Sequence, residues 1–266
     1  MYGVLLGLAA SLFCNVSYGV SKGKKSTYET EFEARRTELL ETYATSPVFE
    51  PYNEMARLET ERPLDELGIR PYLNMIDNRE DCADFFLHGI LWILYKYGDH
   101  PGINPVLLSR MRESVLNFKY WPDEGGEDGL CTWTENHMIL FSSAAYLAGQ
   151  RYPSEIFPNS GWRGRDQMDR HRSRILRWLD FRFRTGFWEF LSNVYYEQDL
   201  TALLSLIEWC EDEEIARRAA MVADTLCLDM ALNSYQGIFG SAHGRSYEAN
   251  TGCRKSSTGW PATPRP

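Results

Sequence analysis

Several features that mark common enzyme classes are missing from this sequence. It contains no CxxC pair and no HExxH motif, the spacings by which many zinc sites are identified. We therefore expect no metal site and no cofactor. A basic excess is also missing, since the formal net charge is −9. A nucleic-acid-binding surface needs basic residues that displace phosphate counterions, so we do not expect nucleic acid as a partner.

Cysteine is scarce, and the six residues present do not suggest a disulfide scaffold. If Cys210 ends one helix and Cys227 lies about 14 residues into the next, the two stand about 20 Å apart at 1.5 Å per residue. A disulfide requires Cα atoms within about 7 Å, so we do not expect this pair to be bonded. An odd number of cysteines follows residue 19, and their pairing stays open: Cys82, Cys131, Cys210, Cys227 and Cys253.

The N-terminal apolar run, VLLGLAASLF at residues 4–13, is too short to span a bilayer comfortably. Small residues follow it at Ser17 and Gly19, so the run predicts a signal peptide over residues 1–19. The protein is then secreted or extracytoplasmic. No Lys or Arg precedes the run and three lysines follow it. An uncleaved N-terminal membrane anchor is therefore the alternative.

Strand-like alternation is nowhere sustained, which predicts an all-α chain. Residues 20–79 are expected to form a linker and an N-terminal helical segment, of which the part after residue 44 is poorly periodic and rich in proline. Residues 80–247 are expected to form one domain of antiparallel helical hairpins. Residues 248–266, rich in Gly, Ser, Thr and Pro, are expected to be a disordered tail. The helical patterns cover residues 28–44, 80–98, 104–121, 134–150, 166–184, 195–211 and 213–234.

The order of these helices places three polar segments at one end of the array. Consecutive helices joined by short links run antiparallel, so alternate links fall on the same rim. The segments are residues 120–137, 185–197 and 233–247, and they carry carboxylates, amides, aromatic rings, His and Arg. We therefore expect a site on this rim.

The run TENH, which begins at Thr134, starts a helix on that rim. As a capping box it would use Thr134 as the N-cap and Glu135 against the helix dipole, with His137 at the third position. Capping gives no reason for Asn136 beside His137, or for Trp133 before them. The alternative is that Asn136 donates to a developing oxyanion and that His137 moves a proton. The sequence leaves both interpretations open.

Four further residues on the rim carry chemistry. Glu197, like Glu135, begins a helix there, and the two carboxylates could serve as acid and base; acids also favour helix N-termini for electrostatic reasons alone. Tyr196 would act as a base if a cation lowered its pKa, or it fills the core. His243 lies between two glycines with Arg245 close behind. Arg245 could bind a carboxylate there, or the segment simply ends a helix.

Aromatic residues make up 14% of the chain, with 8 Trp and 15 Tyr, and this is its most unusual compositional feature. Such rings fill cores or provide flat surfaces for ligands such as sugars. Core packing is the general expectation, but several of these rings lie on the polar rim. The rim aromatics that we expect to contact a sugar are Trp121, Trp133, Trp188, Tyr195 and Tyr247.

Two charged segments are expected to be structural. The arginine-rich helix at residues 166–184 is expected to spread its charge around its circumference and to pair with the excess acids of the chain. The acidic loop DEGGED at residues 123–128 lacks the spacing of a calcium loop. We therefore expect a solvated turn there rather than a cation site.

The helical hairpins and the polar rim together resemble an (α/α) toroid, the architecture of many polysaccharide lyases and six-hairpin glycosidases. Asn136 followed by His137 is similar to the Asn–His pair of several toroid lyase families. The resemblance implies that this pair neutralises the carboxylate of a uronate. It further implies that Tyr196 or His243 abstracts the adjacent proton and that Arg245 assists. The wider run TWTENHMILFSSAAYLAGQ also resembles a set of bacterial and eukaryotic proteins without an established activity.

The chain departs from a complete toroid in one respect. Only three hairpins are readable in the sequence, whereas a closed toroid needs about twice as many. We therefore expect antiparallel hairpins that form a partial or incomplete (α/α) toroid.

The sequence leads to two functional hypotheses. The first is an exported carbohydrate-active enzyme, or a fragment of one, that cleaves a glycosidic bond of a polysaccharide or oligosaccharide by elimination or hydrolysis. The second is a non-catalytic helical scaffold or glycan-binding protein, including an inactive truncated paralogue. Catalysis requires His137, Tyr196 and His243 to converge on one open pocket, whereas a scaffold would bury them separately against the backbone.

Overall fold

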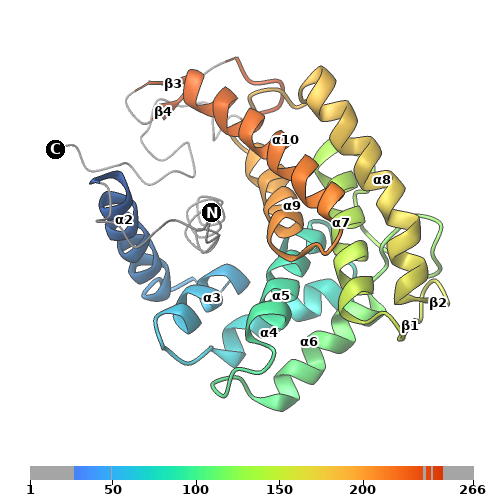
Figure 1. Cartoon of the computed structure of the whole chain (residues 1–266). Helices are drawn as coiled ribbons and strands as arrows, with labels where there is room; N and C mark the ends of the chain where they lie inside the picture. The colour runs from blue at the N-terminus through green and yellow to red at the C-terminus, as the bar shows by residue number, and fades with distance from the viewer. Residues whose placement is uncertain (1–26, 49, 236–237, 241, 248–266) are drawn as a thin grey trace.

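The protein is mostly helical, as the sequence predicts. The structure is a computed structural model that describes residues 27–48, 50–235, 238–240 and 242–247 (Figure 1). The predicted signal peptide at 1–19 and the predicted tail at 248–266 lie outside the described residues. The helices are α2 (Thr27–Ala44), α3 (Pro51–Glu59), α4 (Glu66–Asp77), α5 (Ala83–Tyr97), α6 (Pro105–Asn117), α7 (Glu135–Arg151), α8 (Gly164–Thr185), α9 (Tyr196–Trp209) and α10 (Glu213–Leu232).

The strands of the described residues form two short antiparallel pairs. β1 (Ile156–Phe157) pairs with β2 (Trp162–Arg163) in the link between α7 and α8. β3 (Ser234–Tyr235) pairs with β4 (Ile238–Phe239) after α10. Each strand has two residues, so neither pair forms a layer of its own.

Polar caps and prolines set where several helices begin. Asp65, Asn104 and Asp212 precede α4, α6 and α10, and each accepts hydrogen bonds from backbone N–H groups of the first turn. Pro51 and Pro105 occupy the start of α3 and α6, where a missing N–H costs nothing. The helix beginnings therefore follow from local chemistry.

The stretch after residue 44 corrects the sequence interpretation, because it contains α3 and α4 rather than irregular chain. Ile69, Leu73 and Ile76 are spaced as one helical face and are fully buried. Pro71 lies inside α4 in a helix of only 12 residues. Its presence obscured a short periodic pattern that tertiary packing stabilises.

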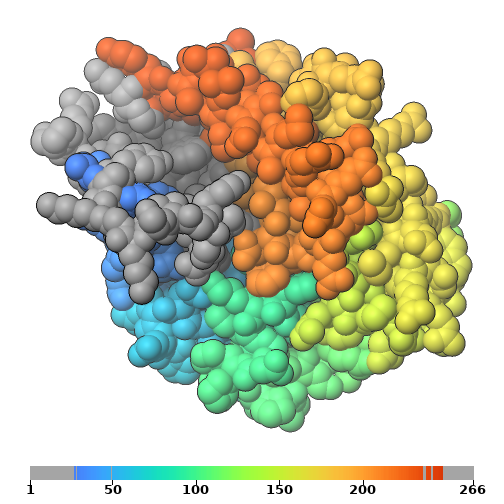
Figure 2. All heavy atoms as spheres, viewed as in Figure 1, coloured from blue at the N-terminus to red at the C-terminus, as the bar shows by residue number. Residues whose placement is uncertain are grey.

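Several helices contact the helix that lies two positions further along the chain. α3 contacts α5, α5 contacts α7 and α7 contacts α9, while α4 contacts α6 and α8 contacts α10. In chain order they follow an arc from α2 through α6 to α8 and α10 (Figure 1). The space-filling view shows a continuous surface from the α4–α6 side to the α8–α10 side (Figure 2).

Helix α7 connects the two hydrophobic clusters of the protein. Phe141 and Ala145 belong to the cluster formed with helices α2 to α6, whereas Leu140 and Leu147 belong to the cluster formed with α8 to α10. Almost every side of α7 is therefore covered, and the polar residues of its first turn are buried with it. None of the described helices is both long and apolar enough to cross a membrane.

Candidate functional site

Hydrogen bonds join the three segments that helix order assigns to one rim. The carboxylate of Glu135 accepts from the backbone N–H of Trp188 at 3.2 Å and of Glu189 at 2.9 Å. Arg245 in turn donates to the Glu189 carboxylate at 2.6 Å. The start of α7, the α8–α9 link and the chain after β4 therefore meet at this rim.

The acidic loop at residues 123–128 does not join this rim. Arg170 of α8 forms an ion pair with Asp123, and Gln167 donates to Glu124 at 3.4 Å. These partners lie in the first two turns of α8, toward the opposite end of the array from the α8–α9 link. The order of the helices therefore predicts the position of the end of the α6–α7 link correctly. It does not predict the position of the first half of that link.

The capping interpretation of the TENH run is wrong in its main feature. Thr134 stands at the N-cap of α7 but caps no backbone N–H with its side chain. Its hydroxyl instead donates to the side-chain oxygen of Asn136 at 2.7 Å. The Asn136 side chain is fully buried, and its Nδ2 group has no hydrogen-bond acceptor among the described residues. An unsatisfied buried amide is costly, so Asn136 has a donor available for a ligand.

Arg182 and two backbone N–H groups converge on the carboxylate of Glu135. It forms an ion pair with Arg182, and both side chains are almost completely buried. The guanidinium and the two backbone donors from Trp188 and Glu189 all stabilise the charged carboxylate. These contacts do not favour Glu135 as a general acid.

His137 is paired with a residue that the sequence analysis did not single out. Its Nδ1 atom lies 2.7 Å from the carboxylate of Asp84 at the start of α5, and both side chains are buried. The imidazole also stacks on Phe85, with ring centroids 5.0 Å apart. Because Asp84 occupies Nδ1, the Nε2 atom is the one that remains for a substrate or a ligand.

Tyr196 and His243 brace the α8–α9 link. The Tyr196 hydroxyl accepts from the backbone N–H of Leu191 at 2.8 Å, while His243 Nδ1 donates to the Leu191 carbonyl. Both rings pack on Phe239. Burial raises the pKa of Tyr196 to about 12. These contacts do not favour either residue as the base beside His137.

Arg245 and two tyrosines form a second contact group. The Arg245 guanidinium lies 4.1 Å from the centroid of the Tyr195 ring and donates to the Tyr247 hydroxyl at 3.1 Å. The two tyrosine hydroxyls are hydrogen-bonded to each other. Arg245 thus already has a carboxylate partner in Glu189 and an aromatic face beneath it.

Glu197 faces a different neighbourhood from Glu135. Its carboxylate is buried and is the second cause, after burial, of the rise in the pKa of Tyr43 to about 12. It likewise raises the pKa of Tyr52. Glu197 therefore lies toward α2 and α3, whereas Glu135 lies against α8. These contacts do not favour the two glutamates as an acid–base pair.

A pocket of about 410 Å³ lies between α7 and α8. The Arg174 guanidinium stacks 3.8 Å from the centroid of the Trp121 ring, and that of Arg182 lies 4.8 Å from the centroid of Trp188. Trp133 does not line this pocket and is 75% exposed. The lining residues are Trp121, Glu135, Met138, Ser142, Arg174, Arg177, Trp178, Phe181, Arg182 and Trp188.

The sequence analysis missed the arginines of this pocket. It expected the charge of the α8 segment to be spread around the helix, and Arg170 and Arg172 do pair with acids. Arg174, Arg177 and Arg182, however, all line the pocket. Together with Trp178 and Phe181 they occupy positions i, i+3, i+4, i+7 and i+8 of one helix face. This spacing is the signal that could have identified them.

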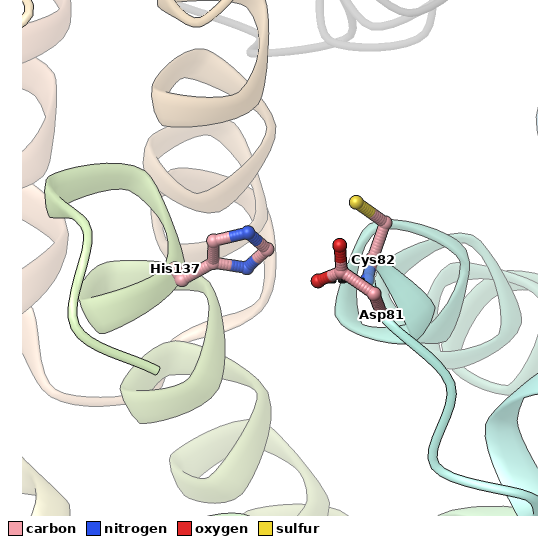
Figure 3. Close-up of side chains that lie close together, drawn as sticks. All are labelled: Asp81, Cys82 and His137. Carbon is pink, nitrogen blue, oxygen red and sulfur yellow. Dashed lines mark hydrogen bonds between the residues drawn. The ribbon is translucent and has the colours of Figure 1, made fainter. Parts of the chain in front are cut away.

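A second group of polar side chains lies on the α5 side of α7. Asp81, Cys82 and His137 each offer one ligand atom, and these atoms lie within 4.8 Å of one another (Figure 3). Burial, followed by the charges of Asp81 and Asp84, raises the pKa of the Cys82 thiol to about 12. A free thiolate nucleophile is therefore not favoured. The sequence expectation of no metal site rested on short motifs and could not detect residues so far apart in the chain.

Comparison of the chain with protein family models, with curated proteins and with solved structures finds no match. A functional proposal must therefore be based on two groups of residues beside α7, the pocket against α8 and the polar cluster against α5.

Proposed function

We propose that this protein binds an acidic saccharide, such as a uronate-containing glycan, in the pocket between α7 and α8. One observation carries the proposal. The pocket combines three tryptophan rings with the guanidinium groups of Arg174 and Arg177, and neither arginine forms an ion pair within the described part of the chain. Indole faces and an anion-binding group are the two features that an acidic sugar requires.

The arginines provide the stronger half of this argument. Arg174 is packed against Trp121, and its NH1 group is buried without a hydrogen-bond acceptor among the residues described. Burial lowers its pKa, as does the neighbouring Arg170. The charges of Asp123 and Glu124 act in the opposite direction. A ligand carboxylate would supply the missing acceptor for the guanidinium. The net negative charge of the protein does not oppose this, because binding depends on the local guanidinium groups.

The scaffold of the proposal is a partial (α/α) toroid. Contacts of α5 with α7, of α7 with α9 and of α8 with α10 support an arrangement in two alternating rows. The α7–α8 pocket would then lie between a helix of each row. Export, which the N-terminal apolar run predicts, would expose the pocket to extracellular glycans.

Cleavage of the glycan by elimination or hydrolysis is our second proposal, and one observation favours it. The amide of Asn136 is fixed through its oxygen by Thr134, while its Nδ2 donor is buried and unsatisfied. A donor held in this way suits the carboxylate of a uronate as it gains enolate character. Binding has the stronger support, because Asn136 is not among the residues that line the pocket and because Tyr196 and His243 are engaged with Leu191.

The test is a binding titration of the full chain with oligouronates and with neutral oligosaccharides of equal length. We expect the acidic ligands to bind. The double variant Arg174→Gln/Arg177→Gln should lose at least about tenfold in affinity, which corresponds to about 1.4 kcal/mol of binding free energy. Arg184→Gln on the same helix is the matched control, because Arg184 is exposed, pairs with Asp180 and lies outside the pocket. Equal affinity of the double variant and the control would refute the proposal. Product analysis of the same mixtures tests cleavage.

A further inference from the structure

Three potential metal ligands meet where the start of α5 faces the start of α7. Asp81 and Cys82 immediately precede α5, and His137 lies in the first turn of α7. Figure 3 shows the Asp81 carboxylate and the Cys82 sulfur on one side of a short gap and the edge of the His137 imidazole on the other. Their ligand atoms lie within 4.8 Å of one another. In a tetrahedral zinc site such atoms lie roughly 3.3–3.8 Å apart, so small side-chain rotations close the site.

The orientation of His137 is already that of a metal ligand. Its Nδ1 atom bonds the buried carboxylate of Asp84 at 2.7 Å, which leaves Nε2 for the ion. Metal-binding histidines usually donate their second ring nitrogen to a carboxylate or a carbonyl in this way, and the partner fixes the tautomer and the ring plane. Stacking on Phe85 further restricts the ring.

The backbone at Cys82 has an unusual conformation, which Glu61, Arg79 and Leu191 share among the described residues. Cys82 adopts the left-handed conformation, with φ of 65°, although it is not a glycine and its side chain caps no backbone group. Such a conformation costs about 1–3 kcal/mol and occurs preferentially at functional sites. The sulfur it places beside His137 is a free thiol.

The local charge favours a cation. Asp81 offers a carboxylate oxygen to the cluster, and one oxygen of the buried Asp84 carboxylate has no hydrogen-bond partner among the described residues. A thiolate, an imidazole and a carboxylate together are ligands that suit Zn²⁺ rather than Mg²⁺ or Ca²⁺. Three protein ligands leave one tetrahedral position for water or for a ligand.

We propose that Asp81, Cys82 and His137 form a zinc site, with Asp84 as the positioning residue for His137. The site is separate from the saccharide pocket. That pocket takes Glu135, Met138 and Ser142 from α7, whereas His137 points toward α5. The zinc proposal and the saccharide proposal can therefore fail independently.

The experiment uses the full chain, freed of metal with a chelator under reducing conditions, and titrates it with Zn²⁺ by calorimetry and with Co²⁺ by absorption spectroscopy. We expect one Zn²⁺ per chain and a sulfur-to-cobalt charge-transfer band. Cys82→Ser and His137→Gln should each weaken zinc binding by about 100-fold or more, and Asp84→Asn by about 10–100-fold. Cys227→Ser is the matched control, since Cys227 is an exposed free thiol on α10.

Circular dichroism in the helical region will show whether each variant folds. If a variant does not fold, the cobalt absorption spectrum of the unmodified protein still decides the test. Several results would overturn the proposal. They are the absence of stoichiometric zinc binding, a cobalt spectrum without the sulfur band, and unchanged zinc affinity in folded Cys82→Ser protein. Recovery of Cys82 in a disulfide from protein purified without reductant would overturn it as well.

Discussion

The imidazole of His137 is held by the carboxylate of Asp84, 53 positions earlier in the chain, at a distance of 2.7 Å. Asp84 is completely buried, and only 4% of the surface of His137 is exposed. Burial raises the pKa of Asp84, and the hydrogen bond from His137 opposes that rise. The pair therefore joins α5 to α7 at a point where an isolated polar group would be costly.

This pair gives the first prediction. Asp84→Ala should lower the free energy of unfolding by about 3 kcal/mol, because it leaves the Nδ1–H group of His137 buried without an acceptor. Asp84→Asn keeps an acceptor oxygen and should cost about 1 kcal/mol. Urea denaturation measures both. Asp224→Ala, an exposed change on α10, should stay within about 0.5 kcal/mol. A loss for Asp84→Ala no larger than for Asp224→Ala would show that the pair is not stabilising.

Much of the helical fold could be predicted because its signals are local. Asn104 and Pro105 mark the start of α6, and the predicted helix at 134–150 matches α7 to within one residue at each end. Helices α3 and α4 could not be read in the same way. They are short, and Pro71 falls inside α4, where a sequence analysis expects a helix to break. Their stability comes from packing, which a local pattern does not contain.

The site was predictable only in part, for a related reason. The order of antiparallel helices was enough to bring Glu135, Glu189 and Arg245 to one rim. It could not show that Glu135 is neutralised by Arg182 or that His137 is paired with Asp84. Those pairings depend on how α7 is rotated between its neighbours. Almost every side of α7 is buried, with apolar and small residues all around it, so the sequence pattern does not fix that rotation.

The second prediction concerns pH. His88 is buried, and burial lowers its pKa from 6.5 to about 4. In the folded protein it stays neutral, with its Nε2–H donating to the Leu140 carbonyl at 3.0 Å, whereas the unfolded chain takes up a proton near pH 6.5. Between these values the unfolded state binds more protons. The contribution of His88 to the free energy of unfolding therefore falls by about 1.4 kcal/mol per pH unit as the pH drops from 6.5 toward 4.

The measurement compares wild type with His88→Gln at pH 7.5 and pH 5. The substitution should cost about 2 kcal/mol less at pH 5, because the variant has no histidine to protonate on unfolding. Leu91→Ala, a neutral change at a buried position of the same helix, should cost the same at both pH values. A cost of His88→Gln that does not depend on pH would contradict the assignment.

The third prediction separates the pocket from the rest of the aromatic rim. Trp188 and Trp133 are similarly exposed, at 65% and 75%, but only Trp188 lines the pocket. Trp188→Ala should weaken binding of an oligouronate at least about tenfold, because it removes an indole face beside Arg182. Trp133→Ala should leave the affinity unchanged. Equal losses in the two variants, measured by calorimetry, would place the ligand elsewhere on the rim.

The last prediction tests whether Cys82 is strained. Its φ of 65° suits glycine and is unfavourable for residues with a Cβ atom. Cys82→Ala and Cys82→Gly both remove the thiol, so their difference isolates the backbone cost. We expect the glycine variant to be more stable than the alanine variant by about 1 kcal/mol in urea denaturation, although glycine is normally the less stabilising residue. Alanine at least as stable as glycine would mean that the backbone at this position is relaxed. In that case the left-handed turn would no longer count as support for a metal site.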